Sequence, residues 1–192
     1  DGFNNGVYVA GDTTSTLNEF SSNTGKDISN SFIAKLATDG SLIWKEEFPD
    51  LYINQIKVSS DGYIYAVGND KDWSRSFLKK LNSDGNEEFS KFHEKISDSD
   101  VIYSEHHTIN ISKDGDIYVT GDGYFKLEDS SRESTGYIIR LNKNGDILWS
   151  EIFANKARYT GFSEDDQNLF VLGIYQNENG DNIDFSINTY NI

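Results

Sequence analysis

The fold is decided by the stretch Asp-Ile-Tyr-Val-Thr-Gly (116–121), which recurs along the chain. It aligns without a gap with Gly-Val-Tyr-Val-Ala-Gly (6–11), Tyr-Ile-Tyr-Ala-Val-Gly (63–68) and Asn-Leu-Phe-Val-Leu-Gly (168–173). Each stretch alternates between apolar and other side chains around a central aromatic residue, which is the pattern of a β-strand. Recurrence at intervals of about fifty residues indicates an internal repeat.

Each repeat contains three more strand-like segments around this one. In the second repeat a first strand at 56–59 leads through an acidic turn into 63–68, a third follows at 76–81, and a fourth ends at Phe89. Asp84-Gly85 is predicted to form the hairpin between the third and fourth strands, since glycine supplies the positive φ that such a turn requires. The other repeats carry first strands at 109–112 and 160–163, third strands at 31–36, 136–141 and, in degenerate form, 184–189, and fourth strands ending at Trp44 and Trp149.

Four strands joined by hairpins form one twisted antiparallel sheet, which is the blade of a propeller. The sequence therefore predicts an all-β chain: a β-propeller of which about three and a half four-stranded antiparallel blades are present. Aromatic side chains at repeated positions are expected to fill the wedge between neighbouring sheets. These are Tyr8, Tyr65, Tyr118 and Phe170 on the second strands, with Trp44, Phe89 and Trp149 on the fourth strands.

The repeat resembles that of the bacterial seven-bladed β-propeller family and, more loosely, that of quinoprotein-like propellers. The resemblance covers nearly the whole chain and is carried by residues 58–68, 111–121 and 32–44. It implies a propeller fold. It does not imply one activity, because propellers of this kind serve many functions.

The strand count is incomplete for four blades. We predict one propeller segment over 1–192, with repeats at approximately 1–51, 52–104, 105–157 and 158–192, the last one incomplete. The fourteen expected strands lack the first strand of the first repeat and the fourth strand of the last. We expect a segment of a larger propeller, completed by flanking chain or by another subunit.

Composition excludes several classes of partner. The 192 residues hold 17 Lys and Arg against 32 Asp and Glu, a net charge of −15 that repels nucleic acid and anionic membrane surfaces. No apolar run is long enough for a membrane helix, so we expect no membrane insertion. The chain has no Cys, which rules out disulfides and thiolate chemistry. The acidity fits a soluble extracellular or cell-surface protein.

Connection lengths predict which end of the sheets binds a partner. The turns between first and second strands and between third and fourth strands are nearly constant. The connections from second to third strand vary from Gly68–Phe77, the shortest, to Gly11–Phe32, the longest, and those that lead to the next repeat vary too. We call the end that carries them the variable face, and function concentrates on such loops. The candidates for partner binding there are Trp73, Arg75, Tyr103, His106, Tyr124 and Arg132.

Each candidate also has a structural interpretation. Trp73, in the shortest of the connections between second and third strands, is either a platform for a ligand or a lid over the edge of the sheet. His106 and His107 lie beside Glu105, and together these types can hold a metal. Because adjacent residues of a strand point to opposite faces, at most one histidine shares a face with Glu105. We therefore predict no metal site there.

Two loops resemble fragments of calcium-binding loops, at 142–146 and 177–182. Both alternate Asn or Asp with other residues, which suits a hard cation, but they lack the bidentate Glu of the complete loop. Turn chemistry explains the same composition. We expect no cofactor, and calcium is the alternative.

Two functions compete. The first is a non-enzymatic extracellular or cell-surface propeller that acts as a binding or structural module for a protein or glycan. The alternative is part of a quinoprotein-like enzyme, suggested by the turn at 39–44, although the chain lacks the vicinal Cys pair that the resemblance implies beside a quinone. A Ser-His-Asp hydrolase is rejected, since no Gly-x-Ser-x-Gly elbow occurs among the residues.

Overall fold

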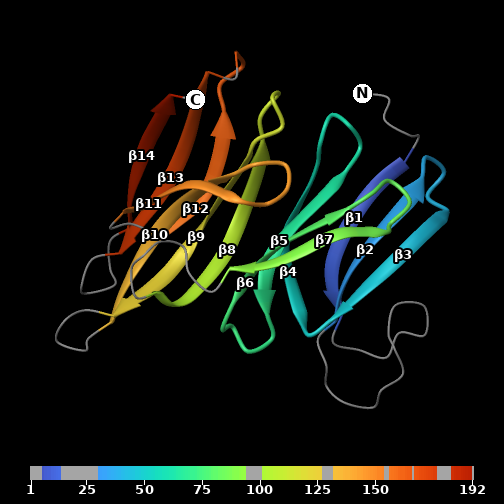
Figure 1. Ribbon diagram of the computed structural model, residues 1–192, viewed down its shortest axis with the longest axis horizontal. Coiled ribbons are helices and arrows are strands. Elements are labelled where there is room, and N and C mark those ends of the chain that lie inside the picture. The colour runs from blue at the N-terminus through green and yellow to red at the C-terminus, as the bar shows by residue number, and fades with distance from the viewer. Residues whose placement is uncertain are drawn as a thin grey trace.

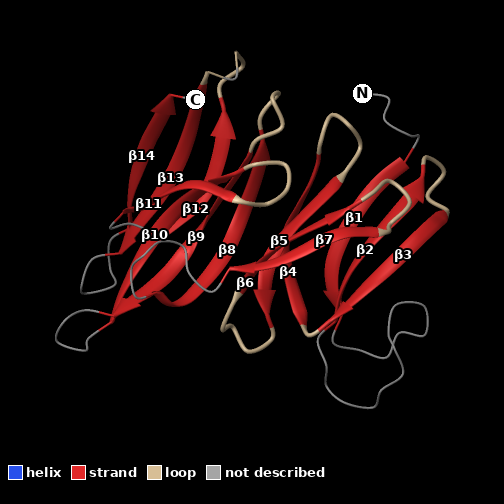
Figure 2. Ribbon diagram, viewed as in Figure 1, coloured by secondary structure: helices blue, strands red, loops and turns tan. Residues whose placement is uncertain are grey.

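The computed structural model describes residues 6–13, 30–93, 101–126, 132–153, 156–165, 167–176 and 183–191, and its regular secondary structure there consists of strands alone (Figure 2). Fourteen strands form four antiparallel sheets, which confirms the predicted all-β propeller architecture. The described residues contain no helix of the length and apolar character that crossing a bilayer requires.

Chain order equals strand order within each sheet. Sheet 1 contains β1 (Gly6–Thr13), β2 (Asn30–Ala37) and β3 (Leu42–Pro49); sheet 2 contains β4 (Leu51–Val58), β5 (Ile64–Asp70), β6 (Ser76–Leu81) and β7 (Glu87–His93). Sheet 3 contains β8 (Val101–Ile111), β9 (Ile117–Lys126), β10 (Arg132–Leu141) and β11 (Ile147–Phe153); sheet 4 contains β12 (Lys156–Phe162), β13 (Asn168–Gln176) and β14 (Ile183–Asn191). The sheets follow one another from sheet 1 at one end to sheet 4 at the other (Figure 1).

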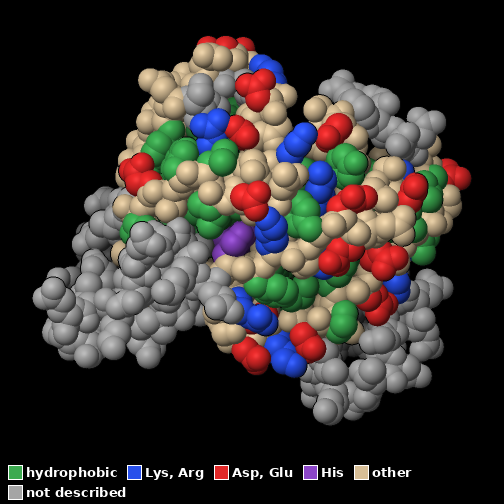
Figure 3. All heavy atoms as spheres, in the orientation of Figure 1, with side chains coloured by type: hydrophobic (Ala, Val, Ile, Leu, Met, Phe, Trp, Pro, Cys, Tyr) green, Lys and Arg blue, Asp and Glu red, His purple; other side chains and the backbone are tan. Residues whose placement is uncertain are grey.

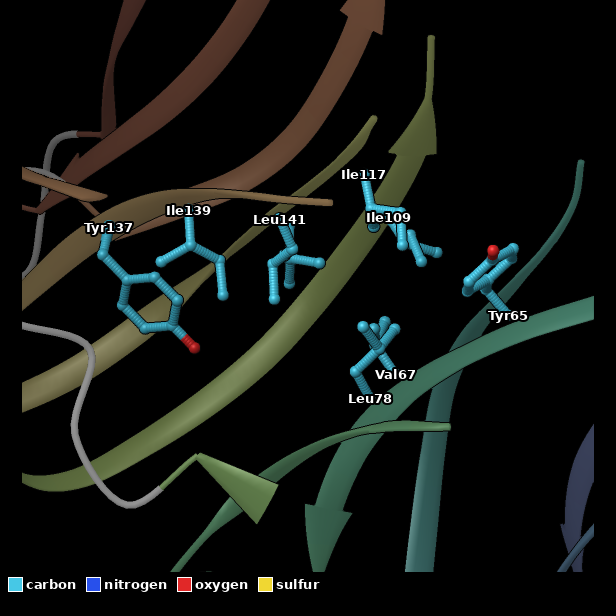
Figure 4. Packing of buried hydrophobic residues seen from close by; sticks show 9 residues of the cluster. Tyr65, Val67, Leu78, Ile109, Ile117, Tyr137, Ile139 and Leu141 are labelled. Carbon is cyan, nitrogen blue, oxygen red and sulfur yellow. The ribbon is translucent and has the colours of Figure 1, made fainter. Parts of the chain in front are cut away.

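Neighbouring sheets pack face to face through one apolar cluster at each interface. The cluster between sheets 2 and 3 joins Tyr65, Val67 and Leu78 to a set of aliphatic residues and a tyrosine of sheet 3 (Figure 4). Burial of such side chains is the main favourable term for holding sheets together. The sheet 3 members are Ile109, Ile117, Val119, Tyr137, Ile139 and Leu141.

Aromatic residues of the last strand of a sheet contact the hairpin of the following sheet. Trp44 of sheet 1 donates its indole N–H to the carbonyl oxygen of Ser83 at 3.0 Å, in the hairpin of sheet 2. A Cβ on Gly85 in that hairpin would lie 3.1 Å from the Trp44 ring, and one on Gly145 in sheet 3 would lie 3.0 Å from the Phe89 ring. The hairpin glycines therefore serve two purposes, because they supply positive φ and leave room for the neighbouring aromatic ring.

Amide side chains of β4 and β5 in sheet 2 bond to β8, the first strand of sheet 3. Asn54 donates to the carbonyl oxygen of His106 at 2.7 Å, and Asn69 donates to that of Ser104 at 2.7 Å. The Gln55 side chain accepts a bond of 2.6 Å from the Ile109 amide. Such bonds satisfy the backbone of β8 on the side where it has no strand partner.

The predicted aromatic core is confirmed in the middle of the molecule and wrong at one end. Tyr65 and Tyr118 are 2% and 1% exposed at equivalent positions of sheets 2 and 3. Phe170, at the same position of sheet 4, is 41% exposed. The reason is that its side chain points to the face of sheet 4 that turns away from sheet 3, where the described residues provide no further sheet.

Candidate partner-binding face

A β-bulge on the first strand of three sheets shapes the variable face. The pairing of β4 with β5 skips Asn54, that of β8 with β9 skips His107, and that of β12 with β13 skips Arg158. A bulge adds one residue to one strand, so the side chains on either side of it no longer alternate. Bulges therefore redirect side chains in the same place in three successive sheets.

The glycines opposite two of these bulges leave room for a carbonyl oxygen of the paired strand. A Cβ on Gly68 would lie 1.8 Å from the carbonyl oxygen of Tyr52, and a Cβ on Gly121 would lie 1.8 Å from that of Glu105. Only glycine permits the bulged strand to approach so closely. Gly68 and Gly121 are thus required by packing across the pair of strands.

A buried chain of hydrogen bonds lies beside the bulge at His107. His93, at the end of β7, places its Nδ1 3.0 Å from Nε2 of His106 in β8. The Nδ1 of His106 lies 2.6 Å from the Tyr137 hydroxyl. If Tyr137 donates to His106, then His106 donates to His93, and both rings are neutral. The chain joins sheet 2 to sheet 3.

Burial keeps both of these histidines neutral. It lowers the pKa of His93 to about 4, with a smaller contribution from the charge of Lys91. Burial also places the pKa of His106 well below its ordinary value, and the nearby His93 and His107 lower it further. At neutral pH these hydrogen bonds between neutral side chains therefore hold sheet 2 against sheet 3.

His107 and Glu105 are two residues apart in β8 and lie on one side of the sheet, as strand alternation predicts. The Nε2 of His107 lies 3.2 Å from the Asp122 carboxylate and its Nδ1 lies 3.6 Å from that of Glu105. Within the described parts of the chain, however, no three acidic or histidine side chains are grouped so that they could hold a metal ion.

Trp73 lies in a tight loop of the variable face that Asp70 organises. The Asp70 carboxylate accepts bonds from the Ser74 amide and hydroxyl, both at 2.7 Å, and from the Arg75 amide and Nε at 3.2 and 3.0 Å. Burial alone would raise the pKa of Asp70, but the hydrogen bonds from Ser74 and Arg75 outweigh it and lower this pKa. A carboxylate therefore stays charged at the centre of the loop.

The Trp73 backbone is held in an unfavourable conformation. Its φ is 56°, which is rare for a bulky residue and costs about 1–3 kcal/mol. The indole is 38% exposed and stacks on the Tyr52 ring, with centroids 5.2 Å apart and an interplanar angle of 20°. The loop thus holds a stacked aromatic pair at the surface, and the ligand platform at Trp73 stays a prediction.

Arg75 lies next to this pair and is held in position. Its guanidinium lies 4.4 Å from the centre of the Phe92 ring while its Nε bonds to Asp70. Its side chain is 42% exposed. A shallow groove of about 420 Å³ runs beside it, with both acidic and basic residues in its wall. Residues of this groove include Pro49, Asp50, Leu51, Lys71, Asp72 and Phe92.

The structure places the other candidates differently. Tyr124 is 41% exposed in β9, where it pairs with Tyr103 of β8. Arg132 begins β10 and pairs with Lys126, so this connection is largely paired strand and not the long loop that we expected. The side chains of Tyr103 and Arg132 lie outside the described residues. His106 is fully buried, and the expectation that it lies at the accessible surface is wrong, because it belongs to the hydrogen-bonded chain between sheets.

The opposite end of the sheets consists of regular hairpins. In the hairpin at 142–146, the Asn142 side-chain oxygen accepts bonds from the amides of Asn144 and Asp146 at 2.9 and 3.0 Å. The Asn142 side chain thus closes this hairpin by turn chemistry, and the calcium alternative stays a prediction. The loop at 177–182 lies outside the described residues. Over the side of the molecule drawn in Figure 3, Lys and Arg side chains lie among Asp and Glu.

Comparisons with known proteins find solved structures that resemble this chain at low sequence identity. No protein-family model matches the chain, and no curated protein matches it significantly. One similar solved structure is the Dos1 propeller, at 11% identity and a TM-score of 0.36, which covers 76% of this chain and 49% of that one. Another is the gluconolactonase XC5397 from Xanthomonas campestris, at 14% identity and a TM-score of 0.32, covering 78% of this chain and 66% of that one. The chain thus spans less than two thirds of each, and its architecture is that of a partial β-propeller.

Proposed function

We propose that the chain is a non-enzymatic propeller module that binds a protein partner through the variable face, in a secreted or cell-surface protein. Its repeat unit would belong to the bacterial seven-bladed family; the number of sheets in a closed ring is not part of the proposal. The net charge of −15 supports such a setting, because a strongly acidic surface favours solubility.

One observation carries the proposal: Trp73 is exposed and strained in a loop that is otherwise tightly bonded. Asp70 fixes the loop, Tyr52 supports one face of the indole, and Arg75 of the same loop is bonded to Asp70. Trp, Tyr and Arg are the residue types that dominate the energy of protein interfaces, particularly when they are held rigid in advance. Strained backbone tends to persist at sites of function.

A glycan is the second candidate partner. The flat stack of Trp73 on Tyr52 offers an apolar surface, and the carboxylates of Asp50 and Asp72 lie in the adjoining groove. A sugar ring could cover the indole while its hydroxyls bond to those carboxylates.

Crosslinking followed by titration tests the proposal. A photoreactive p-benzoylphenylalanine replaces Asp72 on the variable face or, as a control, Asp84 in a hairpin at the opposite end. The partner captured at position 72 is identified and purified, then titrated against the wild-type chain, Trp73→Ala and Tyr124→Ala. We expect Trp73→Ala to weaken binding about 10-fold or more and to leave unfolding free energy within about 1 kcal/mol.

Matched variants separate the two faces and the two kinds of partner. Asp39→Lys and Asp84→Lys change the opposite end and should leave binding unchanged. The proposal is wrong if these two weaken binding and Trp73→Ala does not. Binding of an immobilised glycan panel that depends on Trp73, without any protein partner, would decide for the second candidate.

A further inference from the structure

The two outermost faces of the molecule expose residues that are buried everywhere else in the repeat. Val7 of sheet 1 is 55% exposed, whereas its counterparts Ile64, Ile117 and Leu169 in the other sheets are all fully buried. Phe170 of sheet 4 is 41% exposed, although its counterparts Tyr65 and Tyr118 are almost completely buried and its counterpart Tyr8 is partly buried. Each end face therefore resembles an internal interface from which one partner sheet is missing.

The internal interfaces always join the same two kinds of face. The face of one sheet that carries the aromatic residue of the second strand packs on the aliphatic face of the following sheet. Tyr65 thus shares a cluster with Ile117, and Tyr118 shares one with Leu169. Sheet 4 presents an aromatic-bearing face through Phe170, and sheet 1 presents an aliphatic face through Val7. The two ends are complementary halves of one contact.

Each end face carries an apolar row across all three of its strands. On sheet 1, Val7 pairs with Leu36 and Leu36 with Leu42, and Leu42 is 53% exposed. Side chains directly opposite one another in antiparallel strands lie on the same face. These three residues therefore form a continuous strip, since no charged residue interrupts the row.

The matching row on sheet 4 is larger. Tyr159 pairs with Leu172 and Leu172 with Ile187, and Tyr159 and Ile187 are 62% and 69% exposed. Large contiguous apolar surfaces on a soluble protein mark sites of interaction. Figure 1 places sheets 1 and 4 at opposite ends, so the two rows of one copy do not meet each other.

The hairpin of sheet 1 supports the same conclusion. A Cβ on Gly85 or Gly145 would lie within 3.1 Å of an aromatic ring from the preceding sheet. A Cβ on Gly40, in the equivalent hairpin of sheet 1, would meet nothing within 4 Å. Sheet 1 thus has the receiving hairpin of the repeated contact without an aromatic ring in it.

We propose that the exposed face of sheet 4 in one copy of this chain docks on the exposed face of sheet 1 in a second copy. The row Tyr159, Leu172 and Ile187 then covers the row Val7, Leu36 and Leu42. A second copy is the occupant because every copy carries both complementary faces. Such a head-to-tail contact either closes into a ring or continues as a chain. A ring of two copies would have eight sheets, within the range of about four to eight that is typical of propellers.

Sedimentation of the purified 192-residue chain tests this contact. Copies with a charge of −15 repel one another, so the measurement uses about 0.3 M salt, where the screening length is about 6 Å. At about 100 µM we expect a dimer or larger species. Val7→Glu and Ile187→Glu should each yield monomers, because a buried unpaired carboxylate is strongly disfavoured. Leu148→Glu, at a residue 52% exposed on sheet 3, is the control and should assemble as the wild type does.

Mixing the two variants distinguishes this contact from a symmetric one. Val7→Glu keeps an intact sheet 4 face, and Ile187→Glu keeps an intact sheet 1 face. An equal mixture should therefore form a one-to-one dimer and nothing larger. Leu42→Glu and Tyr159→Glu replace the pair if either variant loses its near-ultraviolet circular dichroism. The proposal is overturned if the wild type stays monomeric, if either variant still assembles alone, or if the mixture stays monomeric.

Discussion

Gly121→Ala should destabilise the chain far more than Gly11→Ala, although both glycines occupy the same position of the repeat, in β9 and in β1. A Cβ on Gly121 would lie 1.8 Å from the Glu105 carbonyl oxygen and 2.5 Å from the Tyr137 hydroxyl. A Cβ on Gly11 would meet only the Phe32 ring, at 3.2 Å. The first neighbour is backbone that must move by more than an ångström, whereas the second is a side chain that moves by a few tenths.

The expected magnitude follows from these contacts. Overpacking costs about 1–3 kcal/mol, and loss of the bond between Tyr137 and His106 adds about 1–2 kcal/mol. Gly121→Ala should therefore lower the free energy of unfolding by about 2–5 kcal/mol. Gly68→Ala, which meets the Tyr52 carbonyl oxygen at 1.8 Å without a tyrosine hydroxyl nearby, should cost about 2–3 kcal/mol. Gly11→Ala should stay within about 1 kcal/mol.

Urea denaturation followed by circular dichroism measures these differences, with the dependence on urea concentration checked for constancy between variants. Tyr137→Phe in the Gly121→Ala background provides the internal check, because the hydroxyl contributes to the steric conflict. The double variant should lose less than the sum of the two single losses. The account of the bulge is refuted if Gly121→Ala lies within about 1 kcal/mol of Gly11→Ala.

Three further outcomes are expected. Trp149 is half-buried and stacks on Tyr190 with ring centroids 6.0 Å apart, so Trp149→Ala should lower the free energy of unfolding by about 2–3 kcal/mol. Neighbouring Leu148 is 52% exposed, and Leu148→Ala should lower it by less than about 1 kcal/mol. Equal losses would contradict the packing role of Trp149. Burial lowers the pKa of His93 from 6.5 to about 4, so the folded state binds fewer protons between these values and stability should fall as pH drops through this window, by up to about 3 kcal/mol. His93→Asn should reduce this dependence of stability on pH, measured by thermal unfolding from pH 7 to 5. An unchanged dependence would argue against a lowered pKa of His93. A strong chelator should leave the melting temperature nearly unchanged, and a fall of many degrees would favour the calcium alternative.

The sequence determined the strands, their order and the sheet-forming repeat. Alternation around Tyr65 and Tyr118, with glycine in each turn, is a local property, because it follows from side-chain direction and permitted φ. The same reasoning identified Trp73 as a surface candidate from its place in a short connection. Its strained φ and its stack on Tyr52 depend on the Asp70 loop and on a strand far along the chain, so they were not predictable.

Only the tertiary structure decided where alternation fails and which faces are covered. The bulge at His107 arises from the pairing of two strands, and His106, which we expected at the accessible surface, lies buried beside it. No residue in β8 specifies this by itself, since a register is a relation between strands. Phe170 likewise has the pattern of a core residue, yet its exposure depends on whether another sheet packs against it. Local sequence determines which side of a strand is apolar, but burial depends on the neighbour that covers it.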